Sequence, residues 1–235
     1  MYYLRHRLRH EIKYYINKSV YHTLRTRLNT VAGPDPNMKD PEGYLISSLY
    51  FDDVYHSAMA EKASGNQFRK KFRLRCYDRS DHVIKLECKR KYAEYISKDS
   101  MPLTRAEYDA ILAEDYGFLL SKPALGQELY ALHCRNLLRP TVAVEYLREA
   151  YVMREGNVRV TFDKDISASV GDFDMFSERF ETRHVLEPGV MVLEVKYDDY
   201  LPDPIYQILK TAMTEKCAIS KYVMCRDEKR RLLYR

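Results

Sequence analysis

The chain of 235 residues has no tryptophan, only eight glycines and no apolar run near the ~20 residues that a membrane-spanning helix needs. Its first residues, MYYLRHRLRHEIKYYI, are basic and contain no apolar core, so they do not form a secretory signal peptide. These absences lead us to expect a cytoplasmic protein with no direct membrane span.

Sequence motifs that indicate several common enzyme classes are also missing. There is no GxxxxGK[ST], GxGxxG or GxSxG sequence, which disfavours a P-loop NTPase, a dinucleotide-binding fold and an α/β-hydrolase. The seven histidines are scattered without an HExxH motif, which argues against a histidine-based metal site. The five cysteines form no CxxC pair and are expected to be reduced, mostly buried thiols.

The charge is unevenly distributed along the chain. The formal net charge is only +5, but between Arg69 and Lys91 ten lysines and arginines stand against three acidic residues. Such a concentration of cations favours a polyanionic partner, which can be a phosphate chain, a nucleotide, a nucleic acid or an acidic lipid. The length and the 46% hydrophobic content fit one large domain over residues 1–235.

Polar and charged residues occupy every second position in five segments that otherwise resemble β-strands. Because strand side chains alternate between the two faces, each segment places one such row on one face. A solvated sheet face gives the same pattern in a single strand, but five such strands predict a shared polar surface inside a barrel wide enough for an anion. The rows are Arg9, Glu11 and Lys13; Lys71, Arg73 and Arg75; Lys85, Glu87 and Lys89; Arg159, Thr161 and Asp163; and Glu194 and Lys196.

The remaining pattern predicts few helices among many strands. Asn17 or Ser19 can cap a helix that ends near Leu28, and Thr104 with Glu107 has the spacing of a capping box. About eight strands predict an antiparallel barrel rather than a βαβ sheet. The predicted strands are 7–16, 44–52, 68–79, 82–92, 140–153, 157–169 and 184–198, and the predicted helices are 55–64, 104–113, 126–137, 204–215 and 223–235.

The row on 68–79 carries three like charges, which repel one another unless an anion lies between them. The planar guanidinium groups of Arg73 and Arg75 match phosphate oxygens. A solvated basic face or a nucleic-acid-binding strand remains the alternative for this segment taken alone.

The carboxylates in these rows have two possible roles. Glu87 and Glu194 lie beside lysines, which is the pattern of ordinary ion pairs and also of a site where a divalent cation bridges phosphate oxygens. Glu194 lies within an apolar run and is expected to be buried, so it needs a partner or a metal. Arg148 shares a face with Tyr146, and Arg159 and Asp163 share a face on the following strand, so a cross-strand ion pair is the alternative explanation for these charges.

The ordered motifs together resemble the VTC domain, the polyphosphate polymerase domain of the vacuolar transporter chaperone family, within the triphosphate tunnel metalloenzymes related to CYTH domains. The resemblance runs from about Arg9 to Tyr222. It is carried by Arg9-x-Glu11-x-Lys13-Tyr14, Ser48-Leu-Tyr-Phe-Asp52, Lys71-x-Arg73-x-Arg75, Leu86-Glu87-x-Lys89, Val144-x-Tyr146-x-Arg148, Arg159-x-Thr161-x-Asp163, Leu193-Glu194-x-Lys196 and Ser220-Lys221-Tyr222.

This resemblance implies an α+β, mainly β fold, an eight-stranded antiparallel tunnel barrel with helices packed outside. It implies Mn²⁺ or Mg²⁺, a nucleoside triphosphate and polyphosphate as ligands, and no nucleic acid. The implied catalytic residues are Lys13, Arg73, Arg75, Lys89, Arg148, Arg159 and Lys221. The implied substrate-binding residues are Lys71, Lys196, Ser220 and Tyr146, and the implied metal ligands are Glu194, Glu87 and Glu11.

One position departs from the wider superfamily. The first strand often carries ExExK there, whereas this chain has Arg9 in place of the first glutamate, which argues for one well-held metal rather than two. The resemblance implies transfer of the γ-phosphate to a growing polyphosphate chain. A hydrolase that uses water at the same site, a polyphosphate-binding module without catalysis and a nucleic-acid binder are the alternatives.

Overall fold

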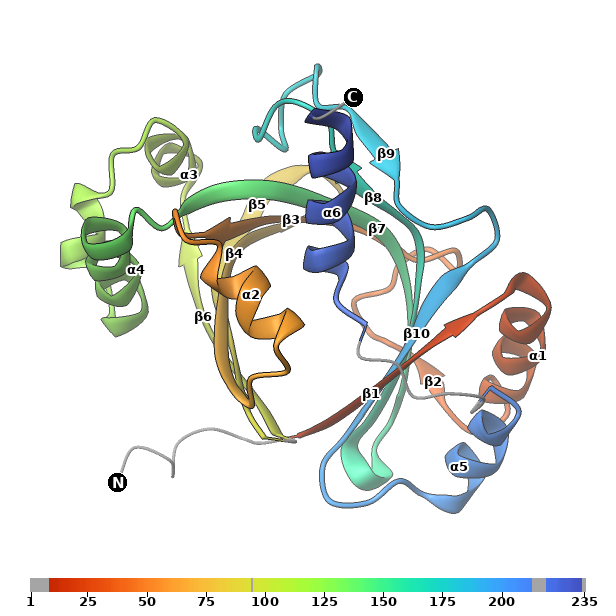
Figure 1. The fold of residues 1–235 in the computed structure, drawn as a ribbon. Helices are drawn as coiled ribbons and strands as arrows, with labels where there is room; N and C mark the ends of the chain where they lie inside the picture. Colours follow the sequence, from red (N-terminus) through yellow and green to blue (C-terminus); the bar gives the residue numbers. More distant parts are fainter. Residues whose placement is uncertain (1–8, 94, 213–218, 234–235) are drawn as a thin grey trace.

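The computed structural model describes residues 9–93, 95–212 and 219–233, which form one antiparallel sheet with helices on both of its faces (Figure 1). The main strands run in the order β1-β10-β8-β7-β3-β4-β5-β6, while β2 pairs with β7 and β9 with β8. The strands are β1 His10–Ile16, β2 Gly33–Pro34, β3 Tyr44–Asp52, β4 Phe68–Tyr77, β5 Ser80–Tyr92, β6 Tyr95–Leu103, β7 Arg139–Met153, β8 Val158–Ser169, β9 Thr182–His184 and β10 Met191–Tyr197.

The two end strands of this path, β1 and β6, meet at an isolated antiparallel bridge between Arg9 and Ile96. The Arg9 N–H donates to the Ile96 carbonyl at 3.4 Å, and the Ile96 N–H donates to the Arg9 carbonyl at 3.3 Å. The sheet therefore curls round on itself, as the approach of β1 to β6 in Figure 1 shows. The predicted α+β, mainly β tunnel barrel is confirmed.

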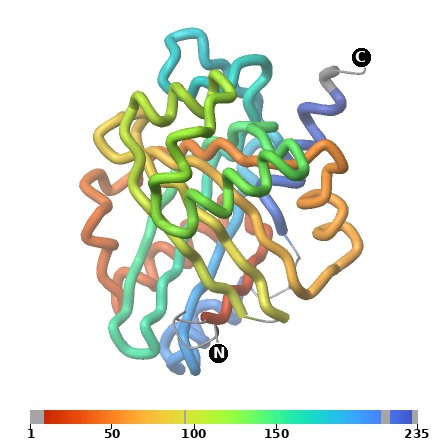
Figure 2. Tube along the Cα trace, turned by 90° about the vertical axis from the view of Figure 1, so that its left-hand side faces the viewer, coloured from red at the N-terminus to blue at the C-terminus, as the bar shows by residue number. Residues whose placement is uncertain are grey.

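Four of the helices cover the convex face of the sheet. Leu74 of β4 and Leu86 of β5 share a buried cluster with Tyr108 and Leu129, and α3 and α4 lie over these strands in Figure 2. A second buried cluster packs α1 and α5 against β1, β8 and β10. The helices are α1 Lys18–Leu28, α2 Ser57–Ala63, α3 Arg105–Leu112, α4 Ala124–Asn136, α5 Asp203–Lys210 and α6 Lys221–Leu233, with short 3₁₀ turns η2 Gly117–Ser121 and η3 Glu155–Asn157.

Helix α6 packs on the opposite, concave face. Its Tyr222 and Cys225 are buried with Val144 and Tyr146 of β7 and with Ile46 of β3. Successive residues of a strand alternate between faces, so Val144, Tyr146 and Arg148 all point into the barrel. The helix therefore fills part of the interior, whereas the sequence placed every helix outside. None of the helices in the described residues is both long and apolar enough to cross a membrane.

Most predicted local elements are confirmed. The Asn17 side chain accepts the Val20 N–H and caps α1, and Thr104 and Glu107 form the predicted capping box. The predicted single strand 184–198 is wrong, because Pro188 and Gly189 make a turn that separates β9 from β10. Strand β6 was not predicted. Residues 213–215 and 234–235 of the predicted helices, and Cys217, lie outside the described residues.

Candidate functional site

The barrel encloses a cavity of about 1100 Å³ with a strongly cationic wall. Fourteen lysines and arginines line it, against the three acidic residues Glu11, Asp99 and Glu194. Thirteen of the fourteen predicted site residues are among those that line it, and Glu87 is the exception. The alternating rows of five strands thus meet in one space, as the sequence pattern predicted.

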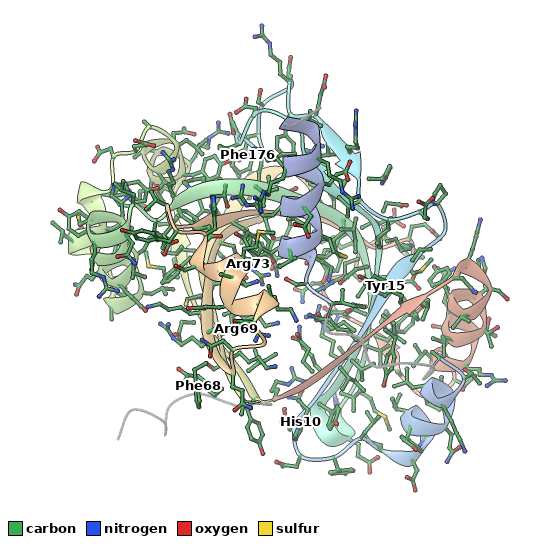
Figure 3. All side chains as sticks on the ribbon, viewed as in Figure 1. His10, Tyr15, Phe68, Arg69, Arg73 and Phe176 are labelled. Carbon is green, nitrogen blue, oxygen red and sulfur yellow. The ribbon has the colours of Figure 1, made fainter. Side chains whose placement is uncertain are left out.

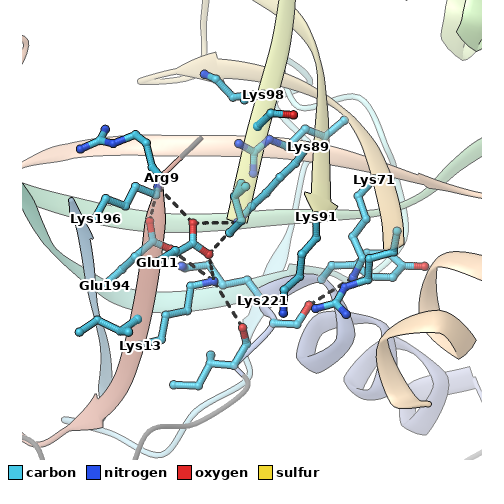
Figure 4. Close-up of a pocket in the computed structure, with 18 of the residues that line it drawn as sticks. Arg9, Glu11, Lys13, Lys71, Lys89, Lys91, Lys98, Glu194, Lys196 and Lys221 are labelled. Carbon is cyan, nitrogen blue, oxygen red and sulfur yellow. Dashed lines mark hydrogen bonds and ion pairs between the residues drawn. The ribbon is translucent and has the colours of Figure 1, made fainter. Parts of the chain in front are cut away.

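A pair of buried carboxylates lies where β1 and β10 run side by side (Figure 4). The Lys13 ammonium lies 2.9 Å from Glu11 Oε1 and 3.4 Å from Glu194 Oε2. Lys196 lies 2.5 Å from Glu194 Oε1 and 3.6 Å from Glu11 Oε2. Lys89 reaches across from β5 and donates to Glu11 at 2.7 Å. The two carboxylates therefore share one group of lysines.

Both carboxylates stay ionised despite burial. Burial alone would raise the pKa of the Glu194 carboxyl, but Lys196 and Lys13 outweigh it and hold the pKa well below its usual range. Burial and the charge of Glu194 would also raise the pKa of Glu11, and the surrounding lysines reverse this effect. The pair thus presents fully charged oxygen donors to the cavity.

These donors fit a hard divalent cation. Mg²⁺ in particular is commonly bound by one or two carboxylates together with substrate phosphates and water. Across residues 9–93, 95–212 and 219–233, no group of three or more histidine, cysteine or acidic side chains is placed to hold a metal. A metal at Glu194 and Glu11 would therefore complete its coordination with phosphate oxygens and water.

The arginines of β4 are fixed from behind by Glu87. Glu87 is 1% exposed, and its carboxylate forms ion pairs with Arg73 at 2.7 Å, Arg75 at 3.7 Å and Lys98 at 2.7 Å. Burial would raise the pKa of Glu87, and Arg73 and Arg75 hold it well below the usual range. Glu87 thus lies behind the cavity wall, where it orients guanidinium groups.

The tyrosine hydroxyls complete this arrangement. Arg73 Nη1 donates to Tyr50 Oη at 2.8 Å, and Arg75 Nη2 donates to Tyr146 Oη at 3.2 Å. Both guanidinium groups are therefore held in place before any anion arrives, and preorganised donors stabilise developing charge most effectively.

The opposite wall holds a buried ion cluster. Arg148 donates to Asp163 through two hydrogen bonds of 2.6 and 2.8 Å, and Lys221 contacts the same carboxylate. Arg148 Nη2 also lies 3.9 Å from Glu194. Asp163 is fully buried and already shared by two cations, so it positions Arg148 and Lys221 rather than facing the cavity. The cross-strand ion pair that the sequence allowed is therefore present, between Arg148 of β7 and Asp163 of β8. Arg159 contacts Asp35 at 2.7 Å.

The amino terminus of α6 lies at this space, because Ser220, Lys221 and Tyr222 line the cavity. The Ser220 hydroxyl accepts the Val223 N–H at 3.4 Å, and Lys71 donates to the same hydroxyl at 3.4 Å. Lys13 also donates to the Ile219 carbonyl at 3.4 Å. A helix amino terminus favours bound anions. The structure therefore brings Ser220 and Lys221, remote in sequence, beside the rows of β1 and β4.

Several lining cations were missed from the sequence. Arg69 and Lys91 extend the rows of β4 and β5 by two residues, so continuing the alternation would have found them. Lys98 lies on β6, the strand that was not predicted, and Lys62 lies on α2, where no alternation exists.

Lys71 is expected to make anion binding dependent on pH. Burial, with Arg69, Lys89 and Lys62 nearby, lowers the pKa of Lys71 to about 7, while Asp52 acts weakly in the other direction. A bound anion stabilises the charged lysine and raises its pKa, so binding takes up a proton above pH 7. The affinity should therefore fall as the pH rises from 7 to 9, by up to about tenfold per pH unit.

The measurement is the Kd for tripolyphosphate against pH for the wild type and Lys71→Arg. Arginine stays charged over this range, so the variant should bind with a flatter pH profile, and comparison at equal pH cancels titration of the ligand. Lys70→Arg, on the other face of β4 beside Glu128, is the matched control. Identical slopes for the wild type and Lys71→Arg would show that Lys71 does not titrate with binding.

The model of the VTC domain matches residues 8–228. The chain belongs to the VTC domain family. The match covers every strand of the barrel and α6 as far as residue 228, so it includes all the residues that line the cavity. No curated protein sequence matches the chain.

Solved structures show that this VTC domain has the fold of the triphosphate tunnel and CYTH-like proteins. A Hippeastrum protein named as an adenylyl cyclase, and described with a dominant triphosphatase activity, is 14% identical with a TM-score of 0.54, over 94% of this chain and 96% of that chain. A Bacillus halodurans protein named as an adenylate cyclase is 12% identical with a TM-score of 0.52, over 89% and 92%. At 12–14% sequence identity, this similarity shows a shared fold alone.

Proposed function

We propose that this VTC domain is a metal-dependent polyphosphate polymerase, which transfers the γ-phosphate of a nucleoside triphosphate, ATP being the expected donor, to a growing polyphosphate chain. The observation that carries the proposal is the wall of fourteen cations and three carboxylates around about 1100 Å³. One metal-bound triphosphate neutralises only part of this charge. Charge and space therefore remain for an acceptor chain, and membership of the VTC family supports the same reaction.

The reaction needs no nucleophilic side chain. An oxygen of the acceptor's terminal phosphate attacks the γ-phosphorus, the bond from that phosphorus to the β–γ bridging oxygen breaks, and a nucleoside diphosphate leaves. Charge spreads over the equatorial oxygens of the transferred group, so positioning and neutralisation supply most of the catalysis. Arg73, Arg75 and Arg148 are held by Glu87, Tyr146 and Asp163 in positions suited to this task.

The carboxylate pair has a distinct role in this proposal. Glu194 and Glu11 would hold Mn²⁺ or Mg²⁺, which when bound neutralises phosphate oxygens and fixes their orientation. Lys13 and Lys196 keep both carboxylates ionised and lie within reach of the same phosphates.

A triphosphatase is the second candidate. The Hippeastrum protein of similar fold is described with a dominant triphosphatase activity, and the same cavity with water as acceptor would give that reaction. The acceptor, rather than any side chain, distinguishes the two.

Phosphorus NMR on the protein with ATP and Mn²⁺ tests the proposal. A growing signal from mid-chain phosphates is the expected result. Orthophosphate or free tripolyphosphate without chain growth would replace the polymerase with the hydrolase. Binding of ATP without turnover would indicate a polyphosphate-binding module without catalysis.

A further inference from the structure

An apolar notch of about 420 Å³ adjoins the phosphate cavity, between β1 and the facing ends of α2 and α6. Lys62, Ile219 and Ser220 line both spaces, so the notch and the cavity are continuous. The described residues that line it are Tyr15, Lys62, Ala63, Ile219, Ser220, Val223 and Met224. The volume lies within the range of about 300–1,000 Å³ for small-molecule sites.

Tyr15 continues the inward-facing row of β1. Glu11, Lys13 and Tyr15 alternate along the strand and share one face, at about 7 Å for every two residues. The Tyr15 side chain is 40% exposed, and its hydroxyl lies 3.0 Å from Met224 Sδ. One strand thus presents a carboxylate and a lysine to the cavity, and then an aromatic ring to the notch. Figure 3 shows Tyr15 on β1 and Arg69 on β4, across the barrel interior.

We infer that this notch binds the nucleobase of the donor nucleoside triphosphate, an inference that rests on the proposed function. A base offers a flat apolar face that stacks on an aromatic ring, and its triphosphate needs cations immediately beyond. Tyr15, Val223 and Met224 supply the apolar and aromatic surface, and Ser220 with Lys71 begins the phosphate wall.

The same argument assigns the two phosphate chains to different parts of the cavity. Polyphosphate is polar and anionic along its whole length, so an apolar notch does not stabilise it. The notch therefore marks the donor side. The acceptor chain lies in the part of the cavity that the notch does not adjoin.

The chemistry of the notch predicts its selectivity. Its polar side chains are Tyr15, Lys62 and Ser220, and the Tyr15 hydroxyl already contacts Met224. Recognition therefore rests on stacking area, which distinguishes purines from pyrimidines better than adenine from guanine. ATP and GTP should bind within about threefold of each other, and UTP should bind more weakly.

The experiment compares the Kd values of ATP and inorganic tripolyphosphate, both with Mn²⁺, by titration calorimetry. Tyr15→Ala should weaken ATP about tenfold, equivalent to about 1.4 kcal/mol, and leave tripolyphosphate unchanged. Val223→Phe, which fills the notch, should do the same. Tyr206→Ala removes a tyrosine of similar exposure from α5 and should alter neither affinity.

The outcomes separate this inference from the proposed function. A notch variant that lowers the affinity for ATP and for tripolyphosphate equally would overturn the inference, and so would one that changes neither affinity. In both cases the base binds elsewhere and the phosphate site stands. Equal affinity of wild-type protein for ATP and tripolyphosphate would also overturn it. Failure of the wild type to bind either ligand would overturn the inference and the proposed function together.

Discussion

Glu194→Gln is expected to lower the rate of polyphosphate synthesis by about a thousandfold while the protein stays folded. The substitution keeps the shape of the side chain but removes the charge that a divalent cation needs. It also leaves Glu11 as the carboxylate that Lys13 and Lys196 still contact among the described residues. Initial rates from phosphorus NMR, taken over a series of Mn²⁺ concentrations, measure the effect.

A second readout distinguishes this loss from misfolding. Removing a negative charge from a cationic cavity should leave metal-free binding of tripolyphosphate unchanged or tighter. Glu178→Gln, on an exposed loop, should alter neither rate nor affinity. Turnover of Glu194→Gln at the wild-type rate would remove Glu194 from the site.

The double variant Arg73→Ala with Arg75→Ala is expected to weaken tripolyphosphate binding by about a hundredfold or more. Each charge-assisted hydrogen bond is worth about 1.5–3 kcal/mol, and a loss of about 2.8 kcal/mol changes Kd a hundredfold. Titration calorimetry without nucleotide isolates this contribution from that of the base.

The same variant should also be less stable, because Glu87 would be left buried with Lys98 as its remaining ion-pair partner. Breaking such a buried pair costs about 3–5 kcal/mol of the free energy of unfolding. Adding Glu87→Gln should recover much of that stability without restoring affinity. Arg79→Ala, which breaks an ion pair with the buried Glu145 outside the cavity, is the control. Unchanged tripolyphosphate affinity in the double variant would place the phosphate site elsewhere.

The cavity wall was accessible from sequence because strand geometry fixes which residues share a face. Lys71, Arg73 and Arg75 cannot avoid pointing the same way once 68–77 is a strand. Closing the sheet then brings rows from distant segments together, as Glu11 and Lys89 show with a contact of 2.7 Å.

The two elements that were missed have different causes. Strand β6 contains Pro102, and it lies at the end of the strand order, where proline is tolerated. The turn that interrupts 184–198 is instead local: Gly189 has a φ of +80° after Pro188, which makes a type II turn, and this Pro-Gly pair is a turn signal in the sequence itself.

The alternating charges also do not show which helix packs on which face of the sheet, or which side chains contact one another across it. Nothing in the α6 sequence shows that its apolar side faces the barrel interior, since Tyr222 and Cys225 would suit an outer core equally. Glu87 shares its row with Lys89, but three cations hold it behind the wall, and only their positions show this.

The crowded cations have a consequence for how long the chain persists in a cell. Fourteen like charges around one space repel one another, which lowers the stability of the ligand-free fold. A polyanion that binds only the folded chain offsets this by mass action, by about 2.7 kcal/mol at a concentration one hundred times its Kd. Proteases remove unfolded chains, so the abundance of this protein would follow the supply of its own phosphate ligands without a dedicated regulator.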